Sequence, residues 1–172
     1  MEYLNEMQKP GIEKVVVHIC VGKSGEELVK AETLLSRLTN TKTVRTLSTH
    51  RIPAWGLKKG EPIGCKATLR NKAAKEFLDR ALVPKDRILK KSNFDKFGNL
   101  AFGIHEYIDL PGIKYDPEIG IFGMNVNATI ERPGYRIKKR HLKNTKVPAK
   151  NMITQEESME FMAENFKVKF EE

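Results

Sequence analysis

The sequence predicts a single α+β domain in two layers, with helices packed on one face of a mostly antiparallel sheet. The chain has 172 residues, the size of one ordinary domain with its own core. Stretches with period-two alternation and stretches with three-four apolar spacing follow one another in the order β-α-β-β-α-β-β-(β)-α. Several links between strands are hairpin-like, which favours antiparallel pairing and helices layered against the sheet.

The first elements are a buried strand and a helix. Residues 1–11 show no period and end in Pro10-Gly11, so we expect a loose N-terminal segment. The run IEKVVVHICVG (12–22) is β-branched and too short for a typical helix, which predicts a strand. If Val15, Val17, Ile19 and Val21 face one layer, His18 and Cys20 face the other. The helix that follows has three-four spacing of its apolar residues, Leu28, Ala31, Leu35 and Leu38.

Between these two elements, Gly22-Lys23-Ser24-Gly25 looks like half of a phosphate-binding P-loop. That motif needs a glycine five residues before Gly22, and this position is Val17, inside the strand. The chain also has no apolar strand ending in Asp to hold magnesium. Nucleotide hydrolysis is therefore disfavoured, and Ser24 is expected to cap the helix.

The central segment, residues 41–70, is strongly basic. It carries seven Lys or Arg residues against one acid, Glu61, and unpaired cations are too costly to bury in a core. Strands are expected at 42–49 and 63–69, with a long Gly- and Pro-rich loop between them that presents Trp55. An exposed aromatic among cations indicates contact with a polyanion that can stack, and nucleic acid is the obvious candidate.

In the strand at 63–69, apolar residues alternate with Gly64, Lys66, Thr68 and Arg70, so one face is apolar and the other polar and basic. The next helix is expected to begin at a cap, Asn71, and to end before Pro84.

The second half of the chain is less regular. Residues 84–99 are predicted to be irregular, with Phe94 and Phe97 as anchors, and strands are expected at 100–108 and 122–131. Residues 132–150 hold eight Lys or Arg and no acid, so we expect a basic ribbon: a short strand that runs into an extended arm. Thr154 and Glu157 form a capping box for a last helix, 154–166, with an acidic outer face.

Composition excludes several classes of protein. No apolar run approaches the ~20 residues of a membrane span, and no apolar segment follows a basic N-terminus as in a signal peptide, so a soluble intracellular protein is expected. Cys20 and Cys65 lack CxxC companions, and both are expected to be reduced residues within strands. No metal site or cofactor is indicated.

Several local sequences together resemble the large-subunit ribosomal protein L5 family, whose members bind 5S ribosomal RNA. The matching stretches, which span most of residues 12–130, are IEKVVVHICVG, GLKKGEPIGCKATLR, KEFLDRAL, FGNLAFGIHEYIDLPGIKYD and GMNVNATI. KKGEPIGCKATLR is the most specific of them. The chain lacks the longer N-terminal helix of bacterial members and carries the basic ribbon and acidic last helix, so it resembles an archaeal-type member.

The resemblance implies a structural, non-catalytic protein of the cytoplasmic ribosome, present there as a monomer and not attached to a membrane. Family members anchor 5S rRNA to 23S rRNA in the central protuberance. They also touch the P-site tRNA through the basic loop and bridge to a protein of the small-subunit head.

The resemblance also implies which residues make these contacts. By position, the family's sheet contacts to 5S rRNA fall on His18, Thr41 and Thr68, and Trp55 lies where the family has an aromatic residue. With the neighbouring cations, the predicted 5S rRNA-binding residues are His18, Thr41, Lys42, Arg45, Lys66, Thr68 and Arg70. The predicted tRNA-contacting loop residues are Arg51, Trp55, Lys58 and Lys59. Arg136, Lys138, Lys139 and Arg140 of the basic ribbon are predicted to contact either RNA or protein.

Two other classes remain open. An RNA-processing or RNA-modifying enzyme would need convergent acid, base or metal-binding residues, and the four histidines form no HxH or HxxxH pair. A DNA-binding regulator would need a recognition helix with basic residues on its exposed face, whereas the first and last predicted helices are acidic or mixed there.

Overall fold

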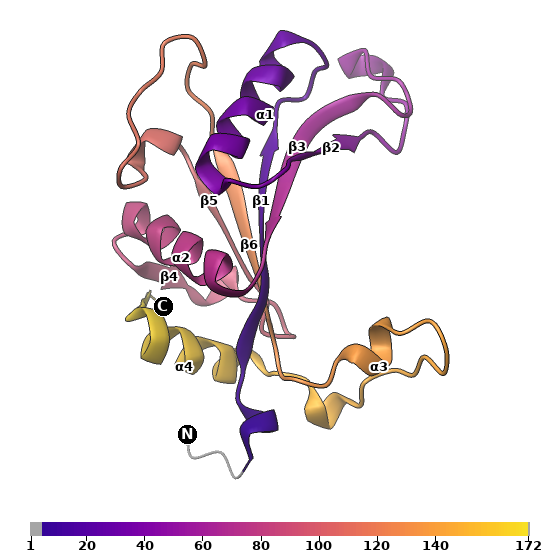
Figure 1. Ribbon diagram of the computed structural model, residues 1–172, viewed down its shortest axis with the longest axis vertical. Coiled ribbons are helices and arrows are strands. Elements are labelled where there is room, and N and C mark those ends of the chain that lie inside the picture. The colour runs from indigo at the N-terminus through magenta and orange to yellow at the C-terminus, as the bar shows by residue number, and fades with distance from the viewer. Residues whose placement is uncertain (1–4, 172) are drawn as a thin grey trace.

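The computed structural model describes residues 5–171 and confirms the α+β class. Its main sheet has five strands in the order β2-β3-β1-β6-β5, and each neighbouring pair is antiparallel. The strands are β1 (Gly11–Cys20), β2 (Val44–Leu47), β3 (Pro62–Leu69), β5 (Leu100–Ile104) and β6 (Met124–Glu131). The strand at the centre of the sheet is β1, which pairs with β3 on one side and β6 on the other (Figure 1).

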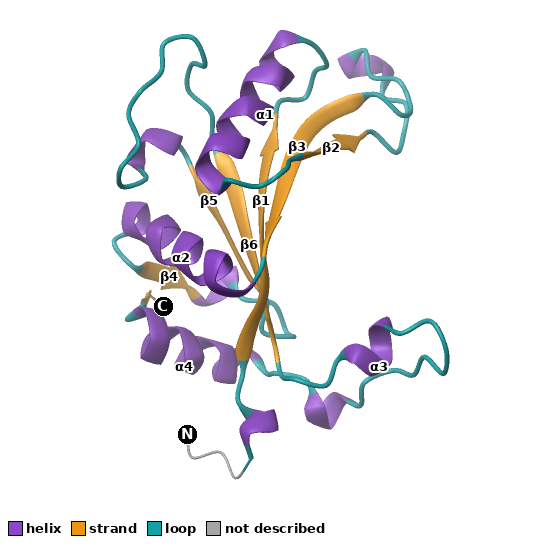
Figure 2. Ribbon diagram, in the orientation of Figure 1, coloured by secondary structure: helices purple, strands orange, loops and turns teal. Residues whose placement is uncertain are grey.

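Helices cover one face of this sheet. They are α1 (Glu26–Thr39), α2 (Asn71–Leu82) and α4 (Gln155–Phe166). Two parts of the chain project at the right of Figure 2, the β2–β3 connection and the segment around α3, and these three helices lie on the side away from them. The register explains the core beneath them. Val17 lies opposite Ala67 in β3 and opposite Val126 in β6, so alternate residues of three strands point to the helices together. All three of these residues are at most 1% exposed.

Segment 84–99 is held in place by the last strand, which the sequence did not predict. It contains a short strand, β4 (Ile88–Lys90), that pairs in parallel with β7 (Lys169–Glu171). The predicted anchor Phe94 is buried and meets Phe170 edge to face, with ring centroids 5.8 Å apart. Phe97 is 57% exposed, so the prediction that it is an anchor was wrong.

Two predicted helix caps were also wrong. The residue before α1 is Gly25 at φ 130°, and the Ser24 hydroxyl donates to the Glu61 carboxylate (2.7 Å) instead of capping the helix. Asn71 is the first residue of α2, at a φ of 54°, and gives no side-chain cap. The capping box of α4 is confirmed, because Thr154 and Glu157 each accept the other's backbone N–H.

Segment 132–150, named the basic arm from here on, departs from the predicted ribbon. It contains a single helical turn, α3 (Arg136–Lys139), and folds back so that the Thr145 amide donates to the Ile137 carbonyl. β6 ends just before the Pro133-Gly134 turn, where Gly134 has a φ of 102° that other residues rarely adopt. Before β1, a 3-10 turn at Glu6–Gln8 gives order to part of the segment predicted to be loose; residues 1–4 lie outside the described residues.

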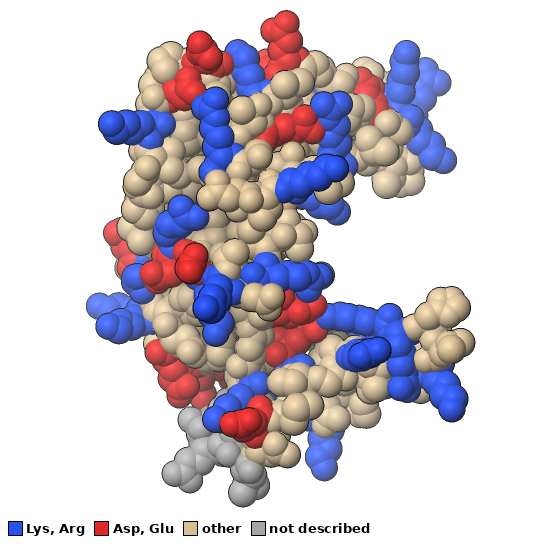
Figure 3. Space-filling view, viewed as in Figure 1, with Lys and Arg blue, Asp and Glu red and all other residues tan. Residues whose placement is uncertain are grey.

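The molecule is hollowed on the side away from α1, α2 and α4. In Figure 3 the outline opens at the right, between an upper projection that includes the β2–β3 connection and a lower one formed by the basic arm. Lys and Arg side chains gather on both projections, so the hollow is bordered by positive charge.

Candidate RNA-binding surface

The face of the sheet opposite the helices, named the open face, carries the polar members of each alternating pair. His18 lies between Lys66 of β3 and Asn125 of β6, and Val16 lies between Thr68 and Asn127. Since side chains alternate across a strand, these residues all point away from the core. The open face therefore brings together His18, Lys66 and Thr68, three of the predicted RNA-binding residues.

His18 is positioned by its neighbours for hydrogen bonding. Its Nε2 lies 3.4 Å from the hydroxyl oxygen of Thr46 in β2. A side chain at Gly64 would crowd this region, since an added Cβ would lie 2.9 Å from the same hydroxyl and 2.7 Å from the Ile19 carbonyl. Burial, and then the charge of Lys66, lower the pKa of His18, so the imidazole is neutral at pH 7. A neutral imidazole has one nitrogen that donates a hydrogen bond and one that accepts, so the ring can bond to a ribose or a base.

Next to His18 the open face has a shallow hollow. It measures about 270 Å³ and is lined by His18, Cys20, Gly103, Ile104, His105, Gly123, Met124 and Asn125. Gly123 lets its backbone approach that of His105 closely, because an added Cβ would meet the His105 carbonyl oxygen at 2.9 Å.

The two cysteines are free thiols within strands, as expected, but their environments differ. Cys20 is exposed at the end of β1, whereas Cys65 is buried in β3. Burial raises the pKa of Cys65 to about 11, which makes it an unreactive core thiol.

Arg45 does not belong to the open face. Its Cα lies opposite that of buried Cys65, so its side chain points to the helices. There its guanidinium makes two bonds, of 2.7 and 2.9 Å, to the Glu32 carboxylate of α1. The structure thus separates Arg45 from Lys66 and Thr68, with which the sequence had grouped it.

The other predicted 5S rRNA-binding residues lie at the border of the open face. Thr41 follows α1 and donates to the Thr39 hydroxyl (2.9 Å), and Lys42 is exposed just before β2. Arg70 follows β3, and its Nη1 lies 2.7 Å from a carboxylate oxygen of Glu13 in β1.

The β2–β3 connection, residues 48–61, is named the finger loop. Trp55 at its tip is 71% exposed, and Arg51, Lys58 and Lys59 are exposed around it. The loop is nevertheless closed on itself, because Ile52 and Leu57 exchange backbone hydrogen bonds of 3.0 and 3.1 Å and the Leu57 side chain is buried. All four predicted tRNA-contacting residues therefore lie on one ordered projection.

Glu61 fastens the base of the finger loop. One carboxylate oxygen accepts the Lys58 amide (2.9 Å), and the other accepts the Ser24 hydroxyl (2.7 Å) from the β1–α1 turn. These two bonds, the Lys58 amide first, lower the pKa of Glu61. The Gly-Lys-Ser turn thus supports the finger loop.

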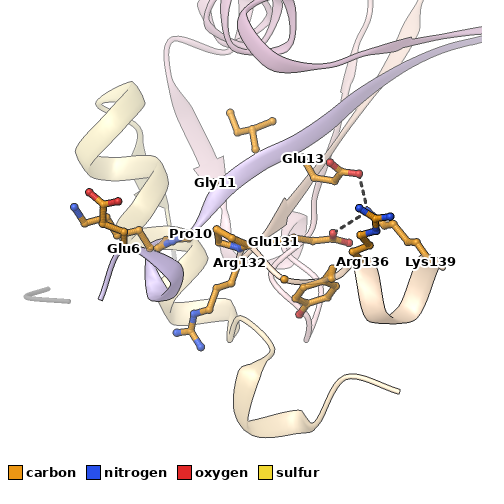
Figure 4. Close-up of a pocket in the computed structure, with 13 residues that line it drawn as sticks. Glu6, Pro10, Gly11, Glu13, Glu131, Arg132, Arg136 and Lys139 are labelled. Atoms are coloured by element: carbon orange, nitrogen blue, oxygen red, sulfur yellow. Dashed lines mark hydrogen bonds and ion pairs between the residues drawn. The ribbon is translucent and has the colours of Figure 1, made fainter. Parts of the chain in front are cut away.

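The basic arm begins beside the first residues of β1. A groove of about 570 Å³ lies at this corner (Figure 4), lined by Glu6, Lys9, Pro10, Gly11, Ile12, Glu13, Glu131, Arg132, Pro133, Gly134, Tyr135, Arg136 and Lys139. Lys139 bonds to Glu13 at 2.6 Å and to Glu131 at 3.2 Å. Arg136, Lys138 and Arg140 are the other predicted cations of the arm. Arg140 donates to the Lys143 carbonyl (2.9 Å), which closes the turn after α3.

Sequence reasoning missed the acids that bond to these residues. Glu13 pairs with the side chain of Lys139 and Glu32 with that of Arg45, whereas Glu61 accepts the backbone amide of Lys58; these partners are between 3 and 126 positions away in sequence. A capping box has a short fixed spacing that can be recognised in a sequence, but these three pairs share no common spacing.

Neither a metal cluster nor a membrane-spanning helix is found in the part of the chain that the structure describes. Within residues 5–171 there is no group of three or more His, Cys, Asp or Glu side chains that could hold a metal ion. No helix in this range is long and apolar enough to cross a membrane.

Comparison with known proteins gives consistent matches along the chain. Residues 5–58 match the family model described as ribosomal protein L5, and residues 62–163 match the model for the C-terminus of the same ribosomal family. Three archaeal proteins named large ribosomal subunit protein uL5 are similar over nearly their full length. The one from Methanosphaera stadtmanae is 49% identical over 98% of this chain and 100% of its own length. That from Methanoculleus marisnigri is 50% identical over 91% and 94%, and that from Sulfolobus acidocaldarius 49% over 95% and 92%.

Proposed function

The chain belongs to the ribosomal protein L5 family of the large ribosomal subunit, and we propose that it binds 5S rRNA through the open face of its sheet. The observation that carries this proposal is the alignment of His18, Lys66 and Thr68 on a surface without helices, between two basic projections. The family supports a structural role in rRNA binding and translation, at the ribosome in the cytoplasm.

The chemistry of the open face suits RNA. A-form helices have a wide, shallow minor groove that displays 2′-hydroxyls, and these groups can bond to the hydroxyl and amide side chains of Thr68, Asn125 and Asn127. Lys66 supplies a phosphate contact in the same row as the neutral His18. Double-stranded DNA has no 2′-hydroxyls and a narrower minor groove, so it fits this surface poorly.

The remaining contacts are proposed for the two projections. The finger loop, with Arg51, Trp55, Lys58 and Lys59, reaches the P-site tRNA, where Trp55 stacks on a base or ribose. The basic arm and the rest of the basic surface touch 23S rRNA in the central protuberance or the small-subunit head protein of an inter-subunit bridge. The protein acts there as a monomer.

The test is whether the purified protein captures 5S rRNA from total RNA. In a filter-binding titration, the affinity for 5S rRNA should exceed that for double-stranded DNA and should fall steeply with salt, with a slope of roughly 0.7 to 0.9 per neutralised phosphate. Equal affinity for the two nucleic acids would contradict the proposal.

The alternative, an RNA-processing enzyme, has a separate test. In the structure Ser24 is bonded to Glu61, and no glycine precedes the Gly-Lys-Ser turn at position 17, so nucleotides should find no phosphate loop. ATP or GTP with magnesium is therefore expected to leave the melting temperature unchanged. A saturable, magnesium-dependent shift would favour the enzyme.

A further inference from the structure

One lysine connects the basic arm to the sheet by charge. Among the described residues, the side-chain hydrogen bonds between α3 and the strands all come from Lys139, to Glu13 of β1 and Glu131 of β6. The other hydrogen bonds of α3 stay within the arm, such as those from Asn144 to the Lys138 carbonyl and from Thr145 to the Ile137 carbonyl. The hydrogen bonds that orient α3 relative to the sheet therefore depend on one side chain.

Glu13 is the centre of this connection. A single oxygen, Oε1, accepts from Lys139 Nζ at 2.6 Å and from Arg70 Nη1 at 2.7 Å (Figure 4 shows the carboxylate beside the arm). One carboxylate of β1 thus joins the end of β3 and the basic arm. Arg70 is 57 positions from Glu13 along the chain, and Lys139 is 126 positions from it.

The local structure of β1 accounts for the position of Glu13. The register of β1 with β6 shifts between Ile12 and Lys14, so Glu13 is the extra residue of a β-bulge. The Glu13 side chain is 25% exposed, and that of Glu131, the other partner of Lys139, is 20% exposed. The bonds from Lys139 and then Arg70 hold the pKa of Glu13 below its usual range, so the carboxylate is charged at neutral pH.

We propose that Glu13 is a positioning residue that sets the RNA selectivity of the surface. It fixes Lys139 and Arg70, and with them the basic arm, at the border of the open face. This inference rests on the proposed function of that face. Cations held in place beforehand lose little freedom on binding an RNA of matching shape, whereas mobile cations bind any polyanion.

The test compares two variants that lose the same charge. Glu13→Gln keeps the size of the side chain but removes the charge shared by Lys139 and Arg70. Glu32→Gln is the matched control, because Glu32 also pairs with a predicted RNA-binding cation, Arg45, but on the helix side and away from the arm. Two quantities are measured for each variant. The first is the affinity for 5S rRNA and for poly(U) at the same salt concentration. The second is the rate of tryptic cleavage after Arg136 and Arg140 in the basic arm, relative to the rate of cleavage within residues 72–90.

The expected result separates the two variants. Glu13→Gln should speed cleavage of the arm several-fold and weaken 5S rRNA binding by about three- to tenfold, while poly(U) binding is unchanged or up to about twofold tighter from the added positive charge. Glu32→Gln should leave arm cleavage unchanged and shift both RNA affinities together. Glu13→Asp, which keeps the charge, should restore most of the preference for 5S rRNA.

A double variant distinguishes positioning from direct contact. If Lys139 is placed by Glu13, adding Lys139→Gln to Glu13→Gln should weaken 5S rRNA binding by less than the product of the two separate effects. Multiplicative effects, or an unchanged ratio of 5S rRNA to poly(U) affinity in Glu13→Gln, would overturn the proposal. If the unaltered protein itself shows no preference for 5S rRNA, the proposed function fails, and the cleavage rates still decide whether Glu13 holds the arm.

Discussion

The open face and the finger loop both present polar and basic side chains, but different parts of the structure position them. On the open face, Lys66 and Thr68 alternate with Cys65, Ala67 and Leu69, which are buried against the helices. In the finger loop, position depends on local backbone bonds and on the two bonds of Glu61. The positions of the open-face side chains are thus set by the core, whereas we expect substitutions in the finger loop to leave the sheet undisturbed.

The largest expected effect comes from removing the support behind the open face. Leu69→Ala replaces a side chain that is 2% exposed, next to Thr68. The free energy of unfolding should fall by about 2–5 kcal/mol, the usual cost of a cavity at a buried leucine. Urea denaturation followed by circular dichroism measures the loss. A change below about 1 kcal/mol would mean that the core behind this strand is loosely packed.

Changes on the open face itself should act on RNA binding without unfolding the protein. Thr68→Val or Arg70→Gln is expected to weaken 5S rRNA binding by about 1 kcal/mol or more, the cost of a lost or unpaired polar contact. An electrophoretic shift assay measures the affinity, and circular dichroism confirms that each variant is folded. Arg70→Gln also removes the ion pair with Glu13, whereas Thr68→Val leaves that pair in place.

Trp55→Ala in the finger loop is expected to have a smaller effect on the free protein. Binding of 5S rRNA should stay within about tenfold, while a stack of ~1–3 kcal/mol is lost at the tRNA contact. The same shift assay sharpens the comparison. If this variant loses 5S rRNA while Thr68→Val keeps it, the two surfaces have been assigned the wrong way round.

The smallest effect concerns the base of the finger loop at acid pH. The pKa of Glu61 is lower in the folded protein than in the unfolded chain, so its contribution to loop order is fully present above the unfolded value of about 4.3. It is lost as the pH falls through the folded value. Amide hydrogen exchange at Lys58, corrected for the intrinsic pH dependence, should become faster in the pH range where Glu61 is protonated. The same increase is expected at neutral pH in Glu61→Gln. Lys66 in the sheet serves as the control and should not respond.

The sequence predicted the parts of the site that follow from alternation alone. Lys66 and Thr68 could be placed because β3 alternates over its whole length, and Trp55 because the loop around it is rich in Gly and Pro. The face of the sheet on which Arg45 lies could not be predicted. β2 has four residues, of which three are exposed, and only its pairing with β3 decides which of them point to the helices. The contact between Glu13 and Lys139 links residues 126 positions apart and left no local pattern.

The same limit applies to the fold. The three long helices and the strands of the main sheet follow from local periodicity, and the α+β class follows from them. β4 was missed because its three residues show no period and because its partner, β7, lies far away along the chain. Phe94 and Phe97 have the same side chain, and only the contact with Phe170 distinguishes the buried one from the exposed one.

The parallel pairing of β4 with β7 has a consequence for the order in which the protein can form during synthesis. Every strand of the main sheet lies between residues 11 and 131, whereas β7 follows all the other elements that the structure describes. Because a ribosome releases the N-terminal part of a chain first, the main sheet can assemble while segment 84–99 still lacks its partner. The nascent protein can therefore form its open face before Phe94 and Leu89 acquire the cover of the last helix and strand.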